Sequence, residues 1–226
     1  MWIDDQILVR AREDLVVHCF VPDANSVVLG CSNKPQLEVD QEFCQKAGIP
    51  VLRRYGGGGT VVLYPGCVVI SVGVWVRDQY ENAWYFRSLN QSVIDLLREL
   101  YPEHAEGFGQ KGISDITYDE RKIAGTSLFR SKNYLLYQAS LLVDCDFELI
   151  SGCLTHPSRE PEYRGGRPHK EFLFGLSSLA SHGVQEVCIR IGQKLPNQIR
   201  DRLNPRLIAS QPGHIKHLMK RARLSG

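Results

Sequence analysis

Apolar segments alternate with polar turn segments through the first third of the chain. β-Branched and apolar residues fill positions 15–21 and 27–29, and a polar stretch containing a proline separates them. This pattern predicts two short strands joined by a turn. Residues 36–47 carry apolar side chains at helical spacing and end before Gly48, which predicts a short helix.

The middle of the chain carries the clearest periodicities. Residues 61–76 are rich in valine and are interrupted by a Pro-Gly pair, which predicts two strands joined by a turn. Residues 113–118 and 122–129 predict two further strands. A helix is predicted for residues 83–100, because these apolar side chains recur at helical spacing: Leu89, Val93, Leu96, Leu97 and Leu100.

The second half adds one more strand and then helices. Apolar and polar side chains alternate over residues 135–143, which predicts a half-buried strand. A helix can begin at residues 146–150, and helical stripes run through 184–195 and 215–222. Because strands and helices are interspersed without regular strand–helix–strand winding, we expect an α+β fold with mixed, largely antiparallel sheets flanked by helices.

The composition is that of an ordinary globular protein, with 43% hydrophobic and 23% charged residues among 226. The seven cysteines include no CxxC spacing, which speaks against a disulfide framework or a zinc site. The start of the chain lacks a signal pattern, and the longest apolar run, 67–76, is too short to span a bilayer. We therefore expect a cytoplasmic protein that does not engage a membrane.

The charge is small overall but uneven. The formal net charge is +2, yet residues 190–226 hold nine Lys or Arg and a single acid, Asp201. Residues 180–226 are thus predicted to form a basic helical end on an acidic body, which suits an acidic partner; a solvated helix face explains the same charges. We do not expect nucleic acid as a partner, because the whole chain is not basic and has no base-stacking motif.

Four consecutive glycines, 56–59, lie between a short strand predicted at residues 51–52 and the strands at 61–76, and they directly follow Arg53, Arg54 and Tyr55. Consecutive glycines cost conformational entropy and bring no side chains. Their expected use is to bring backbone N–H groups close to an anion, and the two guanidinium groups suit a carboxylate or a phosphate. A flexible loop with two solvated arginines is the alternative.

Three segments, in the same order along the chain, carry a family resemblance. They are Arg-Arg-x-Gly-Gly-Gly-Gly-Thr-Val at 53–61, Gly-Ile-Ser-Asp-Ile with Arg-Lys-Ile-Ala-Gly-Thr-Ser at 112–127, and Leu-Leu-Val-Asp at 141–144. Together they resemble the lipoate–protein ligase A and octanoyltransferase superfamily over about residues 10–150. The resemblance implies the catalytic-domain fold that this superfamily shares with biotin ligases.

The resemblance also implies a reaction. ATP, with Mg, would activate lipoic or octanoic acid to an acyl-AMP, and a lysine of an acidic lipoyl carrier domain would accept the acyl group. Lys122 would be the catalytic lysine, and the metal-nucleotide would lie near Asp115, with no structural metal site. The substrate- and nucleotide-binding residues implied are Arg53, Arg54, Gly57, Gly58, Gly59, Thr60, Ser114, Asp115, Ile123, Gly125 and Thr126.

Departures from the family pattern leave alternatives open. Too few residues follow the matched region for a full accessory domain, so we expect a single catalytic domain over residues 1–226. The chain would then need a separate ligase subunit, or act as an octanoyl-carrier-protein-dependent octanoyltransferase with Cys153 as nucleophile. A non-catalytic scaffold is a further possibility, against which Lys122 and the intact glycine run argue.

Two further features have open interpretations. Residues 157–172 include Arg159, Arg164, Arg167 and His169, and form either a lid over the phosphates or a variable surface loop. The acyl chain needs an apolar tunnel, which Val62, Tyr64, Val69 and Ser71 or their alternating partners could line.

Overall fold

The computed structural model of the chain describes residues 7–8, 13–77, 81–157, 160–203 and 208. The basic helix predicted for residues 215–222 lies outside these ranges. No helix within them is long and apolar enough to cross a membrane.

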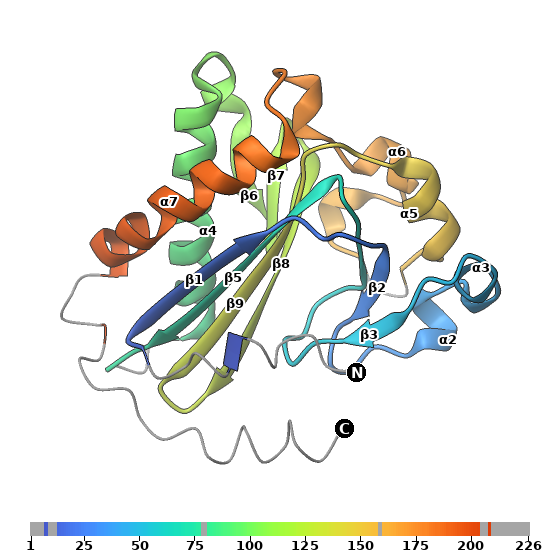
Figure 1. Cartoon of the computed structure of the whole chain (residues 1–226), viewed down its shortest axis with the longest axis horizontal. Helices are drawn as coiled ribbons and strands as arrows, with labels where there is room; N and C mark the ends of the chain where they lie inside the picture. Colours follow the sequence, from blue (N-terminus) through green and yellow to red (C-terminus); the bar gives the residue numbers. More distant parts are fainter. Residues whose placement is uncertain (1–6, 9–12, 78–80, 158–159, 204–207, 209–226) are drawn as a thin grey trace.

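Strands and helices alternate irregularly along the chain (Figure 1). The strands are β1 (Leu15–Phe20), β2 (Ser26–Leu29), β3 (Val51–Arg53), β4 (Val61–Leu63), β5 (Cys67–Trp75), β6 (Phe108–Lys111), β7 (Asp115–Tyr118), β8 (Arg121–Ser131) and β9 (Tyr134–Leu142). The α-helices are α2 (Pro35–Glu38), α3 (Gln41–Lys46), α4 (Asn82–Leu100), α5 (Phe147–Cys153), α6 (His169–Phe172) and α7 (Val184–Leu203). Short 3-10 turns are η1 (Pro102–Gly107), η2 (Glu162–Arg164) and η3 (Leu176–Ser178).

The strands form two sheets. The large sheet has six strands in the order β1-β5-β9-β8-β7-β6, and every neighbouring pair is antiparallel. The small sheet has the order β3-β2-β4, with β2 parallel to β3 and antiparallel to β4. The expectation of mixed, largely antiparallel sheets flanked by helices is therefore confirmed.

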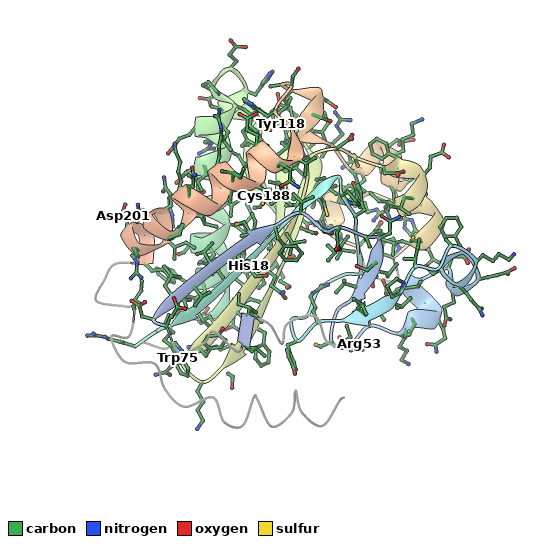
Figure 2. The ribbon with its side chains drawn as sticks, in the orientation of Figure 1. His18, Arg53, Trp75, Tyr118, Cys188 and Asp201 are labelled. Atoms are coloured by element: carbon green, nitrogen blue, oxygen red, sulfur yellow. The ribbon has the colours of Figure 1, made fainter. Side chains whose placement is uncertain are left out.

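Helices α4 and α7 cover one face of the large sheet and pack on each other (Figure 1). The stripe predicted on α4 is buried there, and Cys188 on α7 lies over the sheet (Figure 2). This apolar layer is the main core of the protein, since it joins α4 and α7 to alternate residues of β5 and β9 and to Ile123 and Ala124 of β8.

The other face of the large sheet is covered as well. The small sheet and helices α3, α5 and α6 share a second apolar cluster with the end of that face, and Arg53 marks the small sheet in Figure 2. At the opposite end, Trp75 packs on Tyr134 with ring centroids 5.2 Å apart. All nine residues of β9 are consequently buried, so the prediction of a half-buried strand was wrong.

The single helix predicted for residues 36–47 is in fact two helices, α2 and α3. Val39 interrupts them because it forms an isolated bridge with Leu154. Asp40 then caps α3 by accepting a hydrogen bond from the Phe43 amide at 2.8 Å. A tertiary contact thus overrides the helical periodicity.

The described part of the basic end is neutralised within the chain. On α7, Arg190 pairs with Glu186 of the same helix at 2.7 Å. Three other basic side chains of α7 pair with acids elsewhere in the fold: Lys194 with Glu99, Arg200 with Asp14 and Arg202 with Asp95. The prediction that this basic end binds an acidic partner therefore gains no support from the basic side chains of α7.

Candidate active site

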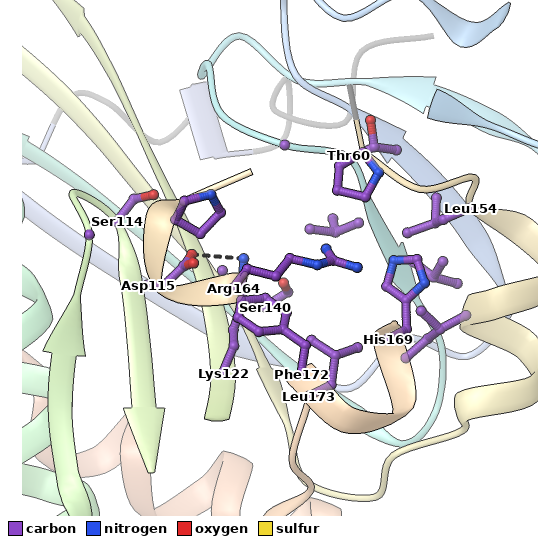
Figure 3. Close-up of a pocket in the computed structure, with 18 of the residues that line it drawn as sticks. Thr60, Ser114, Asp115, Lys122, Ser140, Leu154, Arg164, His169, Phe172 and Leu173 are labelled. Carbon is purple, nitrogen blue, oxygen red and sulfur yellow. Dashed lines mark ion pairs between the residues drawn. The ribbon is translucent and has the colours of Figure 1, made fainter. Parts of the chain in front are cut away.

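A cavity of about 400 Å³ opens where the two sheets approach each other (Figure 3). One side is the sheet wall, formed by Ser114, Asp115, Lys122, Gly125, Ser140 and Leu142. The facing side is the segment wall, formed by Pro157, Pro161, Glu162, Arg164, His169, Phe172 and Leu173. A smaller cavity of about 70 Å³ adjoins it and shares Thr60, Asp115, Lys122 and Ser140, so Lys122 stands where the two cavities meet.

An irregularity in strand pairing turns Lys122 toward the cavities. Asp115 pairs with Gly125 and Ile116 with Ala124, but Thr117 pairs with Lys122, so the register shifts by one residue. Ile123 and Ala124 are both buried in the main core, against strict alternation. A bulge of this kind re-aims a side chain, and here it brings Lys122 to the same side as Gly125.

The Lys122 side chain is held on two sides. Its Nζ lies 2.7 Å from Oδ1 of Asp115, and the lysine and carboxylate side chains are 23% and 9% exposed. A Cβ at Gly125 would lie 3.1 Å from Nζ, so glycine leaves the space that the end of the lysine occupies. The ammonium group is therefore fixed in a mostly desolvated place, where it can stabilise negative charge that develops during a reaction.

Tyr163 lines neither cavity, but it lies between Glu162 and Arg164 of the segment wall and completes a short chain of hydrogen bonds. Its hydroxyl donates to Oδ2 of Asp115 at 2.9 Å. Burial, and then the negative charge of Asp115, raise the pKa of Tyr163, so the hydroxyl keeps its proton and remains a donor. Both oxygens of Asp115 thus have partners, one from each wall.

These contacts involve the carboxylate near which the metal is expected. Carboxylate oxygens are the usual protein ligands of Mg²⁺, and the two oxygens of Asp115 accept hydrogen bonds from Lys122 and Tyr163. Among the described residues, no three His, Cys, Asp or Glu side chains cluster as metal ligands would. Mg²⁺ that enters with a nucleotide is held mainly by phosphates and one or two carboxylates, so these contacts do not test the Mg-nucleotide predicted near Asp115, and we assign the metal no step.

Arg53 and Arg54 hold backbone carbonyls. Nη1 of Arg53 donates to the carbonyls of Gly30, Cys31 and Asn33 at 2.8–3.0 Å. Nη2 of Arg54, a residue only 6% exposed, donates to Gly57 and Gly59 at 2.7 Å. The alternative of two solvated arginines is thus wrong, and both side chains shape the glycine loop and its surroundings.

The glycine run has a packing reason that the sequence alone did not reveal. A Cβ at Gly56 would lie 2.7 Å from Oγ of Ser127, so the loop can approach β8 only without a side chain there. Gly58 has a φ of +90°, which favours glycine. At Gly57, by contrast, an added Cβ would have nothing within 4 Å.

The segment wall brings a second cation and an aromatic ring to the larger cavity. Arg164 is 5% exposed, and its guanidinium carbon lies 4.8 Å from the ring centroid of Phe172. Burial, followed by neighbouring positive groups led by Arg164, lowers the pKa of His169 to about 4. His169 is therefore a neutral hydrogen-bonding group at neutral pH.

Cys153 stands apart from both cavities. It is fully buried beside Cys44, and burial raises its pKa to about 12. A cysteine nucleophile acts as the thiolate and must reach the substrate. Neither condition is favoured by this placement.

The structure gathers most of the residues implied by the family resemblance. Gly59, Thr60, Ser114, Asp115, Lys122 and Gly125 contribute to both cavities, and Arg54 and Thr126 to the smaller one. Arg53, Gly57, Gly58, Ile123 and Cys153 line neither. Of the tunnel candidates, Val62 lines the larger cavity and Val69 the smaller one, whereas Tyr64 and Ser71 line neither.

Several site residues were not foreseen from the sequence. Gln138 and Ser140 of β9 are 8% and 9% exposed and line the smaller cavity. Both are polar positions in the alternation of residues 135–143. That alternation predicts a strand face exposed to solvent, whereas in the structure these side chains face a cavity. Tyr163 gave no sequence signal, since only the fold brings it to Asp115.

Comparisons with known proteins identify the family of this chain. Residues 2–194 match the family described as the lipoyl protein ligase A/B catalytic domain. Lipoate-protein ligase A subunit 1 of Thermoplasma acidophilum is 29% identical over 168 residues, which are 72% of this chain and 64% of that protein. The chain spans less than two thirds of the length of the first curated relatives that it matches.

Solved structures share the fold. A bipartite lipoate protein ligase of T. acidophilum, studied with its E2 lipoyl domain, superposes with a TM-score of 0.72 at 20% identity, covering 99% of this chain and 89% of that one. A lipoate-protein ligase A bound with ATP gives 0.69 at 24% identity, covering 88% and 78%. With the family match extending over most of its length, this chain belongs to the lipoyl protein ligase A/B catalytic domain family.

Proposed function

We propose that this protein is the catalytic part of a lipoate– or octanoate–protein ligase. It would activate the acid with ATP and transfer the acyl group to a lysine of a lipoyl carrier domain. The observation that carries the proposal is the position of Lys122, an ion-paired, mostly buried ammonium group at the junction of two cavities.

The larger cavity has the surfaces that such a substrate needs. Its volume of about 400 Å³ lies within the usual range of small-molecule sites. Apolar side chains from both sides of the cavity suit a hydrocarbon chain. They are Val62, Leu142, Ile150, Leu154, Phe172 and Leu173. Thr60, Ser114 and Ser140 bring hydroxyl groups to the end at Lys122, where a carboxyl or phosphate group would lie.

The reaction would proceed in two steps. A carboxylate oxygen of the acid attacks the α-phosphorus of ATP and pyrophosphate leaves, which gives the acyl-AMP. The amino group of the carrier lysine then attacks the acyl carbon, AMP leaves and a proton is released. In both steps negative charge builds on oxygen atoms, and the fixed ammonium of Lys122 would stabilise it. The relative solved with ATP supports the choice of nucleotide.

The octanoyltransferase alternative is weaker on geometric grounds. It requires a reactive cysteine, and the predicted Cys153 is buried, lines neither cavity and has a raised pKa. A ligase that needs a second subunit is better supported, because one relative is named as subunit 1 and another belongs to a bipartite ligase. We therefore include a partner subunit in the proposal as a possible requirement of the activity.

Intact-protein mass spectrometry of a lipoyl carrier domain tests the proposal. The domain is incubated with this protein, octanoate or lipoate, and Mg-ATP, and octanoyl-carrier protein serves as the donor in a parallel reaction. Acylation that requires both free acid and ATP is the expected result. Acylation from the carrier-protein donor alone, lost in a Cys153→Ala variant, would replace the ligase with a transferase.

A second arm addresses the partner subunit. The same reaction is repeated after adding an accessory ligase subunit of the kind found in bipartite relatives. Activity that appears only then supports the two-subunit form of the proposal. If no condition gives acylation and the protein binds neither acid nor nucleotide, the ligase proposal fails.

A further inference from the structure

Arg164 is a charged side chain of the cavity that has an unsatisfied hydrogen-bond donor. It comes from η2, is 5% exposed and points into the larger cavity between Lys122 and His169 (Figure 3). Its Nη2 atom is buried and has no hydrogen-bond partner in the described part of the chain. A buried guanidinium N–H normally finds an acceptor, so such an atom in a cavity indicates a missing ligand.

The other contacts of Arg164 orient it without using that atom. Nε donates to the carbonyl of Arg167 at 2.9 Å and lies 3.3 Å from the Glu160 carboxylate. The ring of Phe172 stacks against the guanidinium group, 4.8 Å from its carbon atom. The Glu160 carboxylate is shared, because it also contacts His156 and accepts a hydrogen bond from the Gly166 amide. The side chain is therefore held at Nε and on its face, which leaves Nη2 for a ligand.

The chemistry of the open guanidinium edge favours an anion as that ligand. Arg164 and Lys122 bring two cations to a cavity that is also lined by Glu38, Asp115 and Glu162, but no contact joins any of these acids to Nη2, and Asp115 is bonded to Lys122 and Tyr163. Burial lowers the pKa of Arg164, which agrees with a cation that lacks full compensation in the free protein. A planar guanidinium binds carboxylate and phosphate oxygens particularly well.

We propose that Arg164 is an anion-binding residue of this site, and that its guanidinium receives the carboxylate of the acid or the phosphate of the nucleotide. The inference rests on the proposed ligase function and extends it to the segment wall. It also gives that segment a task in substrate binding.

Calorimetric titration of the full chain with octanoate and with AMP tests the proposal. Arg164→Gln is expected to weaken at least one of these anions about tenfold or more, because a charge-assisted hydrogen bond is lost. Loss for AMP alone identifies the phosphate as the group bound, and loss for octanoate alone identifies the carboxylate. Arg164→Lys, which keeps the charge, should recover part of the affinity.

Lys170→Gln is the matched control. Lys170 is a cation of the same segment, but it is exposed and does not line the cavity. Its loss should change both affinities less than about twofold. Affinities within twofold of wild type for Arg164→Gln, or an equal loss in Lys170→Gln, would overturn the proposal.

Two further readouts keep the outcome interpretable. If Arg164→Gln no longer unfolds cooperatively, Arg164→Met, which removes the charge but keeps an unbranched side chain beside Phe172, becomes the test variant, and unchanged affinity for both anions then overturns the proposal. Failure of the ligase function would appear in the wild type, as absent carrier acylation. Failure of the Arg164 assignment would appear only in the variants, with wild-type acylation intact.

Discussion

The two walls of the larger cavity are built in different ways. The sheet wall takes its residues from β7, β8 and β9, whose positions are fixed by continuous antiparallel pairing. The segment wall consists of short turns and one-turn helices, and two glycines, Gly165 and Gly166, have positive φ values there. The segment wall therefore owes its position to a few side-chain and backbone contacts with the rest of the protein.

Two of those contacts are made with Asp115 and Lys122 of the sheet wall. Tyr163 donates to Asp115, and the amide of Phe174 donates to the carbonyl of Lys122 at 2.9 Å. The proposed catalytic lysine thus also anchors the opposite wall. We infer that the sheet wall supplies the reactive group and the segment wall supplies a binding group. Substitutions in each wall test this division.

The largest effect is expected at Lys122. Lys122→Ala should lower the rate of carrier acylation about 100- to 1,000-fold, since a fixed cation next to the developing charge is removed. Acylation is followed by mass spectrometry, and the thermal midpoint confirms folding. Lys111→Ala is the control, because Lys111 pairs with Glu120 at the surface. Near wild-type activity of Lys122→Ala would remove the catalytic role from the sheet wall.

A smaller effect is expected where the glycine loop packs on the sheet. Gly56→Ala should destabilise the protein by about 1–3 kcal/mol, because the new Cβ would overlap Ser127. Gly57→Ala, with open space around it, is the matched control and should change stability by less than about 0.5 kcal/mol. Urea unfolding measures both. Equal effects in the two variants would contradict the close approach, and Ser127→Gly should rescue Gly56→Ala if it is correct.

The smallest effect is expected at the link between the walls. Tyr163→Phe removes the hydrogen bond to Asp115 and should lower kcat/KM of acylation about five- to tenfold, equivalent to one modest hydrogen bond. Tyr118→Phe is the control, because the Tyr118 hydroxyl contacts His104 outside the cavity. An unchanged kcat/KM for Tyr163→Phe would mean that the two walls act independently.

Local patterns predicted one wall of the site and missed most of the other. The family resemblance pointed to Asp115, Lys122 and Gly125, because these lie in short motifs on adjacent strands that match the family pattern. The segment wall has no such motif, and the sequence of residues 157–172 is equally compatible with a lid and with a surface loop. Arg164 matters because it lines the cavity, and Tyr163 because it donates to Asp115. Both contacts join segments distant in sequence, and the periodicity of one segment cannot predict them.

By itself, the sequence determined the number and kind of most elements. The apolar stripe of α4 and the valine-rich strands are local patterns, because apolar side chains must be buried on one face of a helix or strand in any fold. It also determined which glycines and charged residues were available for chemistry. Tertiary structure decided where they act. The bulge that turns Lys122 to the cavity, the bridge that splits α2 from α3, and the burial of Gln138 and Ser140 all depend on partners distant in sequence. Which face of a strand meets solvent and which meets another layer is set by the packing of whole sheets, and no single segment encodes it.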